Sequence, residues 1–149
     1  MKLHPDFKEF LQLLNAHHVK YLLVGGYALA IHGYPRSTGD MDIWYQSEPD
    51  NIDRLLDVLR QFGFSSTGLT ATDLVEPEIV IQLGYPPVRI DLMNSITGVS
   101  FDEAFGRRIL IHAGGVEISC ISLDDLKRNK KATGRLLDLS DLEQLEGLS

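Results

Sequence analysis

One stretch of the sequence, residues 20–45 (KYLLVGGYALAIHGYPRSTGDMDIWY), constrains the fold and chemistry of this chain more than any other. Its pattern predicts a buried strand over 21–24, a Gly-Gly turn, a short helix over 27–32, a polar loop and a second strand. That second strand carries Asp40 and Asp42, and residues two positions apart on a strand share one face. We therefore expect the two carboxylates to project together, with Cα atoms roughly 6.5 to 7 Å apart.

Two carboxylates held so close repel each other unless a positive charge lies between them. A divalent metal ion meets this need, because Mg²⁺ prefers carboxylate oxygens and also binds the phosphate oxygens of a substrate. The turn at Gly25 and Gly26 indicates the same chemistry, since glycines between a strand and a helix leave backbone N–H groups open to a phosphate. The stretch thus predicts a metal site beside a phosphate-binding turn. The alternative for the acids is a charged strand edge that prevents aggregation.

The spacing of these motifs resembles that of a known superfamily. A V-G-G motif at 24–26 is followed, after thirteen residues, by D-M-D-I at 40–43, which is similar to the signature of DNA polymerase β-like nucleotidyltransferases. The R-S-T sequence at 36–38 resembles more particularly the small bacterial members, the AbiEii toxin-like and the antibiotic-modifying nucleotidyltransferases. The resemblance is close over 20–45 and loose over most of the remaining chain. It implies a minimal nucleotidyltransferase fold in which Asp40 and Asp42 hold metal ions.

A third acid, Asp91, lies in a strand-like segment further along the chain. Residues 78–83 and 88–93 are predicted to be two strands, and the G-Y-P-P sequence between them is short enough for an antiparallel hairpin. A carboxylate inside an otherwise apolar strand is costly to bury without a partner. Alternation places Arg89 on the same face as an ordinary partner. The resemblance implies a different one, because the superfamily has a third carboxylate on a neighbouring strand that completes the metal site and serves as the base.

The resemblance also implies which residues bind the phosphates of a nucleoside triphosphate: Gly25, Gly26, Arg36, Thr38 and either Lys127 or Lys130. Arg36 and Thr38 would line the phosphate channel, although turn residues of this kind also form simple connections. Near the C-terminus, Leu-x-x-x-Lys, Gly-Arg and two later aspartates resemble a signature of the small toxin-like members, in which a lysine supports the triphosphate. The sequence does not choose between Lys127 and Lys130, and a solvated helix face is their ordinary alternative.

For three other residues, an ordinary structural role is the main alternative to a role in the site. Trp44 shares a face with the acids and could stack on a base, but a partly buried structural tryptophan is an equal expectation. His32, at the end of a short helix, is expected to be structural. Cys120 has an alternating apolar setting that favours a packed thiol over a nucleophile.

Length and composition predict a single domain over residues 1–149, and the resemblance implies that it is a nucleotidyltransferase domain. The chain is 44% hydrophobic, which suffices for one core, and its single cysteine excludes an internal disulfide framework. No run of about eighteen apolar residues and no signal-like N-terminus is present, so we expect neither export nor a membrane span and place the protein in the cytoplasm. A net charge of −7 argues against nonspecific binding to nucleic acid.

The remaining segments alternate between helix and strand patterns. Helices are predicted over 5–18, over 50–62 with Asp50 as N-cap, and from Ser122 onwards with a break at Gly134, while a Gly-Gly turn joins two strands over 108–113 and 116–121. Residues 65–77 are predicted to be a surface loop. The expected fold class is α/β (α+β): a mixed, largely antiparallel sheet of about five strands, with helices mainly on one face.

The resemblance implies transfer of a nucleoside monophosphate from an NTP to a hydroxyl acceptor, with two Mg²⁺ ions, or Mn²⁺ in their place, and with release of pyrophosphate. The acceptor could be tRNA, a protein or a small molecule. One alternative is an antibiotic nucleotidyltransferase that acts on an aminoglycoside or lincosamide. The other is a non-catalytic nucleotide-binding module of a toxin–antitoxin pair, with an antitoxin or a second copy of the chain as partner.

Overall fold

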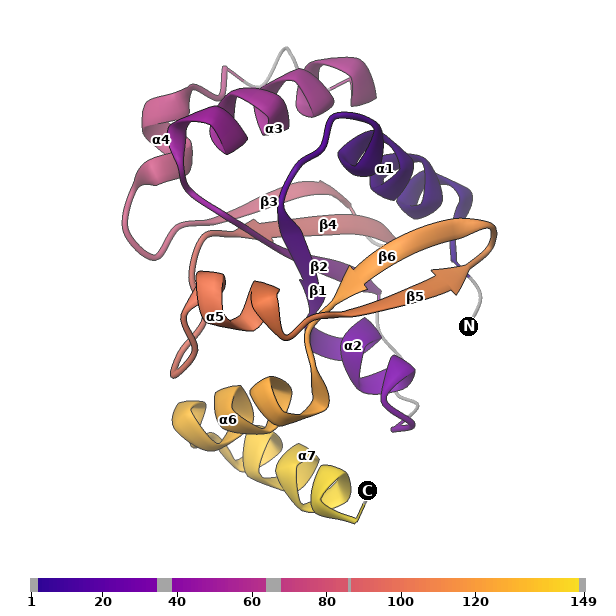
Figure 1. Ribbon diagram of the computed structural model, residues 1–149, viewed down its shortest axis with the longest axis vertical. Coiled ribbons are helices and arrows are strands. Elements are labelled where there is room, and N and C mark those ends of the chain that lie inside the picture. Colours follow the sequence, from indigo (N-terminus) through magenta and orange to yellow (C-terminus); the bar gives the residue numbers. More distant parts are fainter. Residues whose placement is uncertain (1–2, 35–38, 64–67, 86, 148–149) are drawn as a thin grey trace.

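The computed structural model describes residues 3–34, 39–63, 68–85 and 87–147, which form a mixed sheet flanked by helices (Figure 1). The sheet has six strands: β1 (Tyr21–Val24), β2 (Asp40–Tyr45), β3 (Val80–Tyr85), β4 (Val88–Met93), β5 (Ile109–Ala113) and β6 (Val116–Cys120). The described helices are α1 (Pro5–Ala16), α2 (Gly25–Ile31), α3 (Pro49–Phe62), α4 (Ala71–Val75), α5 (Phe101–Gly106), α6 (Leu123–Thr133) and α7 (Leu136–Glu146). None of these helices is both long and apolar enough to cross a membrane.

The strands are arranged in the order β3-β4-β2-β1-β6-β5. β2 pairs with β4, and β1 with β6, in parallel, whereas β1–β2 and the two hairpins β3–β4 and β5–β6 are antiparallel. The predicted α+β class with a mixed, largely antiparallel sheet is thus confirmed. The sheet has six strands rather than about five, because the β5–β6 hairpin joins the same sheet.

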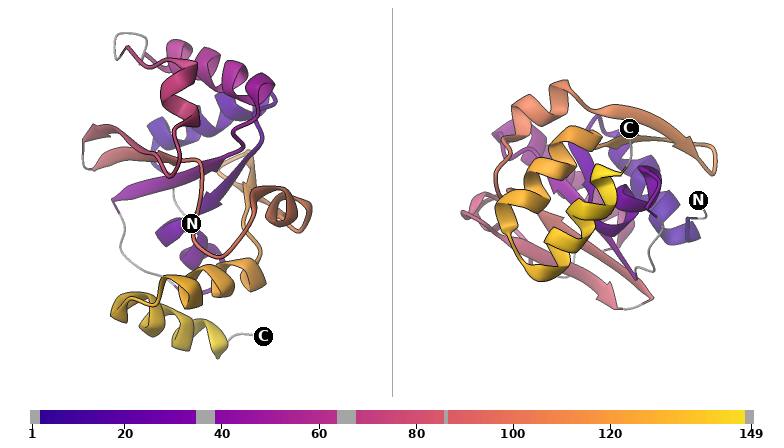
Figure 2. Two further views of the ribbon diagram at one scale, coloured as in Figure 1. Left: turned by 90° about the vertical axis from the view of Figure 1, so that its left-hand side faces the viewer. Right: turned by 90° about the horizontal axis from the view of Figure 1, so that it is seen from below.

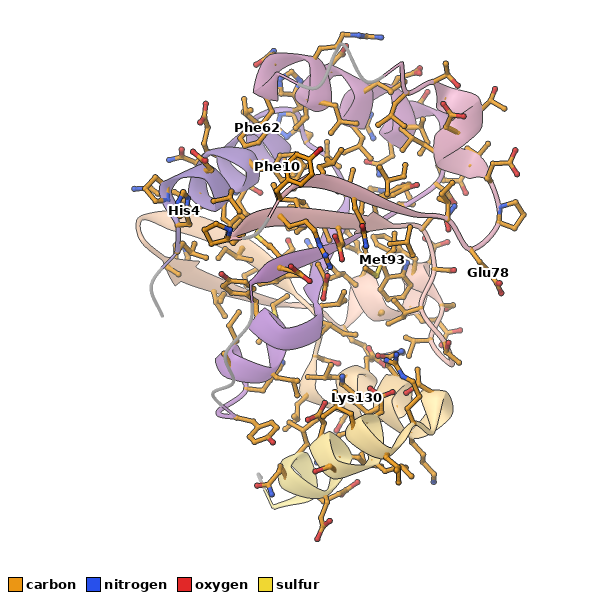
Figure 3. The ribbon with its side chains drawn as sticks, turned by 180° about the vertical axis from the view of Figure 1, so that it is seen from behind. His4, Phe10, Phe62, Glu78, Met93 and Lys130 are labelled. Carbon is orange, nitrogen blue, oxygen red and sulfur yellow. The ribbon has the colours of Figure 1, made fainter. Side chains whose placement is uncertain are left out.

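Apolar side chains pack on both faces of the sheet. Leu23 and Ile43 point into the larger cluster, which α1 and α3 cover, and Phe10 and Phe62 meet edge to face between these helices, with ring centroids 5.2 Å apart (Figure 3). Helices also pack on the other face, so the expectation of helices mainly on one face is not met. A smaller cluster on the other face includes Trp44 and adds contacts from α2, α5 and α6. Figure 2 shows α6 and α7 side by side at the end of the molecule opposite α3.

The C-terminal helix pair begins and breaks where local sequence directs it. Ser122 caps α6 by accepting a hydrogen bond from the backbone N–H of Asp125, at 3.2 Å, as the capping pattern predicts. Gly134 ends the helix with φ of 66°, a left-handed conformation that glycine adopts without steric cost. The chain can therefore turn back at once into α7.

Two local predictions need correction. α3 begins at Pro49 with Glu48 as N-cap, so Asp50 lies in the first turn and is not the cap, because proline is well suited to the first helical position. The predicted loop over 65–77 contains α4, which begins with a reciprocal capping box between Thr70 and Asp73. The T-x-x-D signal for this helix was present in the sequence and was overlooked.

Candidate active site

The three predicted acids lie close together on two neighbouring strands. β2 and β4 pair in parallel with Asp42 opposite Asp91, and Asp40 opposite Arg89. Asp91 is buried, and Asp40 and Asp42 are half-buried. The structure therefore brings together the D-x-D pair and a third acid that is about fifty residues away in the sequence.

Arg89 joins two of these acids. Its guanidinium donates to both carboxylate oxygens of Asp91, at 3.0 and 3.2 Å, and also to Oδ2 of Asp40. These hydrogen bonds, above all those with Asp91, raise the pKa of Arg89. Arg89, the partner that strand alternation predicts for Asp91, is thus paired with it. Arg89 also binds Asp40 on the neighbouring strand β2.

Asp42 is the most strongly perturbed acid of the group. Burial raises the pKa of Asp42, and repulsion from Asp91 and Asp40 raises it further, to about 7, although Arg89 and Lys130 act in the opposite direction. Three carboxylates therefore lie close together at this end of the sheet, and two of them pair with Arg89. An additional cation here would relieve the repulsion.

The donor set fits a hard divalent cation, since Mg²⁺ and Mn²⁺ favour carboxylate oxygens. Within the described ranges, however, no group of three or more His, Cys, Asp or Glu side chains converges on a single point where a metal ion could be held. Arg89 binds oxygens of Asp40 and Asp91 that could serve as metal ligands. The residues fit a metal ion by their chemistry, and Arg89 competes with a metal ion for these oxygens.

The glycine turn lies directly against Asp42. Val24 is opposite Asp42 in the β1–β2 pairing, and Gly25 follows it with φ of +69°. A Cβ atom at Gly25 would overlap the Asp42 carboxylate, so only glycine fits both the conformation and the space. Gly25 and Gly26 both line the adjoining pocket, where their backbone is accessible.

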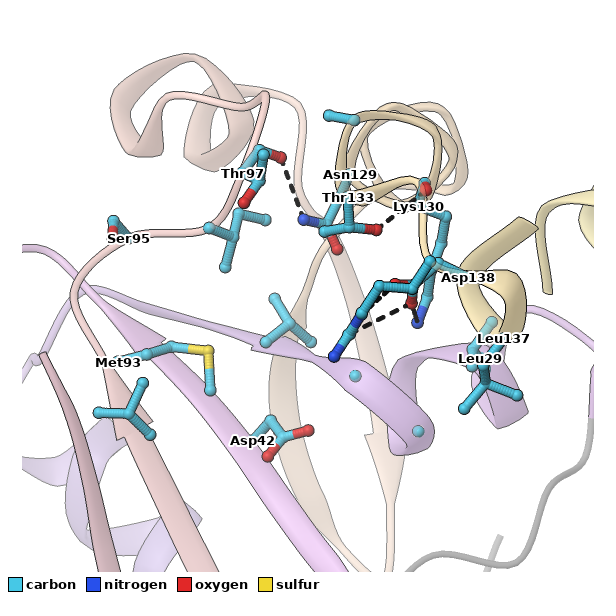
Figure 4. A pocket seen from close by; sticks show the side chains of 17 residues that line it. Leu29, Asp42, Met93, Ser95, Thr97, Asn129, Lys130, Thr133, Leu137 and Asp138 are labelled. Carbon is cyan, nitrogen blue, oxygen red and sulfur yellow. Dashed lines mark hydrogen bonds and ion pairs between the residues drawn. The ribbon is translucent and has the colours of Figure 1, made fainter. Parts of the chain in front are cut away.

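That pocket has a volume of about 730 Å³ and lies between the sheet and the α6–α7 pair (Figure 4). Figure 4 shows Asp42 on the sheet side and Lys130 and Asp138 on the helix side. Pockets of roughly 300–1,000 Å³ are typical of small-molecule sites. The volume is thus sufficient for a nucleotide. Of the three acids on the sheet, Asp42 belongs to the lining, and Asp40 and Asp91 do not.

The structure distinguishes the two candidate lysines. The ammonium of Lys130 lies 3.2 Å from Oδ1 of Asp138 and 3.3 Å from Oδ2 of Asp141, is almost completely buried, and lines the pocket. Lys127 instead forms an ion pair with Glu146 at 3.9 Å. Of the two, Lys130 has the position that a phosphate-binding lysine needs.

Trp44, His32 and Cys120 take their ordinary structural roles. Trp44 is buried and meets Phe101 edge to face at 5.1 Å, and Nε2 of His32 lies 2.7 Å from the carbonyl oxygen of Ile121. Cys120 is buried, and burial raises the pKa of its thiol to about 12, which leaves it protonated at neutral pH.

The remaining predicted residues, Arg36 and Thr38, lie outside the described residues. Several pocket residues were not identified from the sequence, among them Thr97 and Asn129, which are joined by a hydrogen bond of 3.0 Å from Asn129 Nδ2 to the Thr97 carbonyl oxygen. Neither belongs to a recognisable motif. They meet only because α6 folds back toward the segment that follows β4, and no local signal predicts this.

Three solved structures share this fold. A nucleotidyltransferase candidate from Thermotoga maritima is 14% identical with a TM-score of 0.58, and the match covers 98% of this chain and 92% of that one. Lincosamide antibiotic adenylyltransferase LnuA, in its lincomycin-bound form, is 14% identical with a TM-score of 0.58, covering 99% and 98%. The antibiotic-resistance factor ANT(2'')-Ia is 11% identical with a TM-score of 0.56, covering 94% and 80%. At these identities the likeness concerns the fold.

No match is found among curated protein sequences. The model of one protein family, described as nucleotidyl transferase of unknown function (DUF2204), matches residues 4–148. This match covers nearly the whole chain and agrees with the superfamily that the V-G-G and D-x-D motifs resemble. The chain therefore belongs to the DUF2204 family of nucleotidyl transferases.

Proposed function

We propose that this nucleotidyltransferase transfers a nucleoside monophosphate from an NTP to a hydroxyl group of an acceptor, in a reaction that needs a divalent metal ion and releases pyrophosphate. One observation carries the proposal: Asp91 and Asp42 are directly paired on the adjacent strands β4 and β2, Gly25 at the start of α2 lies against Asp42, and Asp42 and Gly25 line a pocket that Lys130 also lines. In this arrangement Asp91 would face the acceptor, Asp42 would lie at the reaction centre, and Gly25 and Lys130 would face the phosphates.

The acids would hold the metal. Asp40 and Asp42 would bind two Mg²⁺ ions, or Mn²⁺ in their place, and Asp91 would complete the coordination of one of them. Bound there, the ions would neutralise the triphosphate and favour ionisation of the acceptor hydroxyl. The half-protonated state expected of Asp42 near neutral pH supports this assignment, because a cation would restore full ionisation of a carboxylate that burial and repulsion disfavour.

Asp91 is the proposed general base. The acceptor oxygen attacks the α-phosphorus and loses its proton to an Asp91 oxygen, while the bond from the α-phosphorus to the bridging oxygen of the β-phosphate breaks. Pyrophosphate leaves with the electrons of that bond. Arg89 now occupies both oxygens of Asp91, so it has to give up at least one of these hydrogen bonds for the base to act.

The opposite side of the site would bind the phosphates. Gly25 lies against Asp42, Gly26 lines the same pocket, and Lys130 is close enough to Asp42 for its charge to lower the pKa of that acid. Preorganised positive charge at the position where negative charge develops is among the strongest contributions to catalysis. Arg36 and Thr38, in the loop between α2 and β2, are proposed to line the same phosphate channel.

The acceptor is the least constrained part of the proposal. A toxin-like member acting on tRNA or protein in the cytoplasm, as a single domain with an antitoxin or a second copy as partner, follows from the resemblance. An antibiotic acceptor is supported by the shared fold of LnuA and ANT(2'')-Ia. Transfer to a small molecule also suits the net charge of −7, which would repel a nucleic acid. A non-catalytic module is disfavoured by the retained group of acids.

The test is to incubate the protein with Mg²⁺ and each NTP, labelled either at the α- or at the γ-phosphate, in the presence of tRNA, total protein, aminoglycosides or lincosamides. We expect label in one acceptor pool from the α-labelled NTP, while γ-label appears only in pyrophosphate. The Asp91→Asn variant should lose this labelling, and Asp53→Asn, at an exposed position on α3, should retain it. Acceptor labelled from the γ-position, or equal labelling by Asp91→Asn, would contradict nucleotidyl transfer at this site.

A further inference from the structure

A second cation, Arg135, lines the pocket together with Lys130. Arg135 is the residue immediately before α7, and it belongs to the same pocket lining as Asp42 and Gly25. Its side chain is 76% exposed, so a ligand can reach the guanidinium. The side chain does not cap α7, and its partner in the helix is Asp138.

The guanidinium is nevertheless fixed in direction. Asp138 is buried and accepts hydrogen bonds from Nε and Nη2 of Arg135, the second at 3.4 Å, while its Oδ1 also accepts from Lys130. A guanidinium has five N–H groups, and two of them are engaged here, so three remain on the outer edge. A cation that is already oriented loses less conformational entropy when it binds a ligand.

Arg135 adds positive charge to the pocket wall. Lys130 is paired with the two buried carboxylates of Asp138 and Asp141, which offset its charge. Arg135 is largely exposed and presents its remaining N–H groups in the planar arrangement that suits phosphate oxygens.

The order of strands indicates which phosphates these are. In-line attack places the leaving group on the side of the α-phosphorus opposite the acceptor. If Asp91 marks the acceptor side, the leaving group points past Asp42 toward Gly25 and the α6–α7 pair. Resting on the proposed function, we propose that Arg135 is a phosphate-binding residue, oriented by Asp138, that contacts the β- and γ-phosphates of the NTP, the part released as pyrophosphate.

The chain offers a closely matched control. Arg128 pairs with the buried Asp125 at 2.7 Å, three residues apart on α6, just as Arg135 pairs with the buried Asp138 three residues later. Both arginines are largely exposed, and replacing either by glutamine removes one positive charge. The described pocket lining includes Arg135 and not Arg128. Any difference between the two variants therefore reports the local contact rather than the overall charge.

The experiment is a calorimetric titration of wild type, Arg135→Gln, Arg135→Lys and Arg128→Gln with ATP, GTP, CTP and UTP in the presence of Mg²⁺. It continues with the monophosphate of whichever nucleotide binds, and with pyrophosphate. Arg135→Gln should raise the Kd for NTP and pyrophosphate about 10-fold or more, with the monophosphate unchanged within about twofold, as expected for a lost charge-assisted hydrogen bond. Arg135→Lys keeps the charge but not the planar donor pair, so its loss should be intermediate. Arg128→Gln should bind like wild type.

Equal effects of Arg135→Gln and Arg128→Gln, or an equal loss of monophosphate and triphosphate binding in Arg135→Gln, would overturn the assignment. The proposed function would still hold if the wild-type protein transferred label from the α-phosphate of the NTP to an acceptor. Failure of wild type to bind any NTP would instead refute the proposed function, and the role of Arg135 with it.

Discussion

Two acids, Asp42 on the sheet and Asp138 on the helices, line opposite sides of the pocket, and their pKa values are shifted in opposite directions. On the sheet, burial and repulsion from Asp91 and Asp40 raise the pKa of Asp42 to about 7. On the helices, burial alone would raise the pKa of Asp138, but hydrogen bonds from Arg135, Thr133 and Lys130 outweigh it and lower the pKa to about 2.

The difference lies in the number of cations for each acid. Among the described residues, Arg89 pairs with Asp40 and Asp91, whereas Lys130 and Arg135 both pair with Asp138, and Lys130 also pairs with Asp141. The ion pairs of Asp138 favour its charged form. Asp42 instead lies beside two other acids, and a buried carboxylate with such neighbours is where a bound cation is expected to act.

Replacing Asp42 should have the largest effect. Asp42→Asn removes a metal ligand, so we expect transfer activity to fall by about 10³-fold or more. The same change removes repulsion, so the unfolding temperature without metal should be unchanged or higher. Activity assays and thermal unfolding in EDTA measure the two effects. A variant that loses activity only in proportion to lost stability would show that Asp42 is structural.

Replacing Lys130 should affect stability most. Lys130→Ala leaves Asp141 buried without this cation and weakens the pairing of Asp138, for which we expect a loss of about 3 kcal/mol in the free energy of unfolding. Lys127→Ala removes a more exposed pair with Glu146 and should cost less than about 1 kcal/mol. Urea denaturation of both variants gives the comparison, and equal losses would contradict the distinction drawn between the two lysines.

Replacing Arg89 should make the three acids on the sheet depend more strongly on metal. Arg89→Gln frees the oxygens of Asp40 and Asp91 and removes the competing cation, so the Kd for Mg²⁺ should fall roughly 10-fold. Without metal the variant should unfold at a lower temperature than wild type, and Mg²⁺ should raise that temperature more in the variant. Arg60→Gln, which breaks an exposed pair on α3, is the control. Weaker Mg²⁺ binding in Arg89→Gln would mean that Arg89 helps to hold the metal site together.

The smallest expected effect is the acid sensitivity of the ion pairs of Asp138. The pKa of Asp138 is about 2 in the folded protein, below its ordinary value of 3.8, so its ionisation stabilises the fold above about pH 4. This contribution should be lost as the pH falls from 4 through 2. The difference in unfolding free energy between wild type and Asp138→Asn should therefore shrink over that interval, as urea denaturation at each pH would show. A constant difference would contradict the low pKa.

The local elements could largely be predicted from sequence, because each has its own signal. The apolar run over 21–24, the Gly-Gly turn before β6 and the Ser122 cap all specify their structure from neighbouring residues. The missed helix α4 had such a signal too, in the capping box of Thr70 and Asp73.

Contacts between elements that are distant in the chain could be predicted from the sequence only in part. That Asp91 would lie beside the D-x-D pair was suggested by the superfamily resemblance, since no periodicity shows which strands pair. The link from Arg89 to Asp40 depends on the β2–β4 register and had no counterpart in the sequence pattern. The choice of Lys130 over Lys127 likewise depends on α7 folding back against α6, which places Asp138 and Asp141 around one lysine.

The central claim, that the acids of β2 and β4 form a metal-dependent reaction centre, is tested most directly by a crystal structure with Mn²⁺ and a non-hydrolysable NTP analogue, using the anomalous signal of manganese. We expect manganese peaks bound by oxygens of Asp40, Asp42 and Asp91, with Arg89 turned away from at least one of them and the triphosphate directed toward Lys130. A nucleotide bound in the pocket with Arg89 still joining Asp40 to Asp91, and no manganese peak at these carboxylates, would contradict the claim.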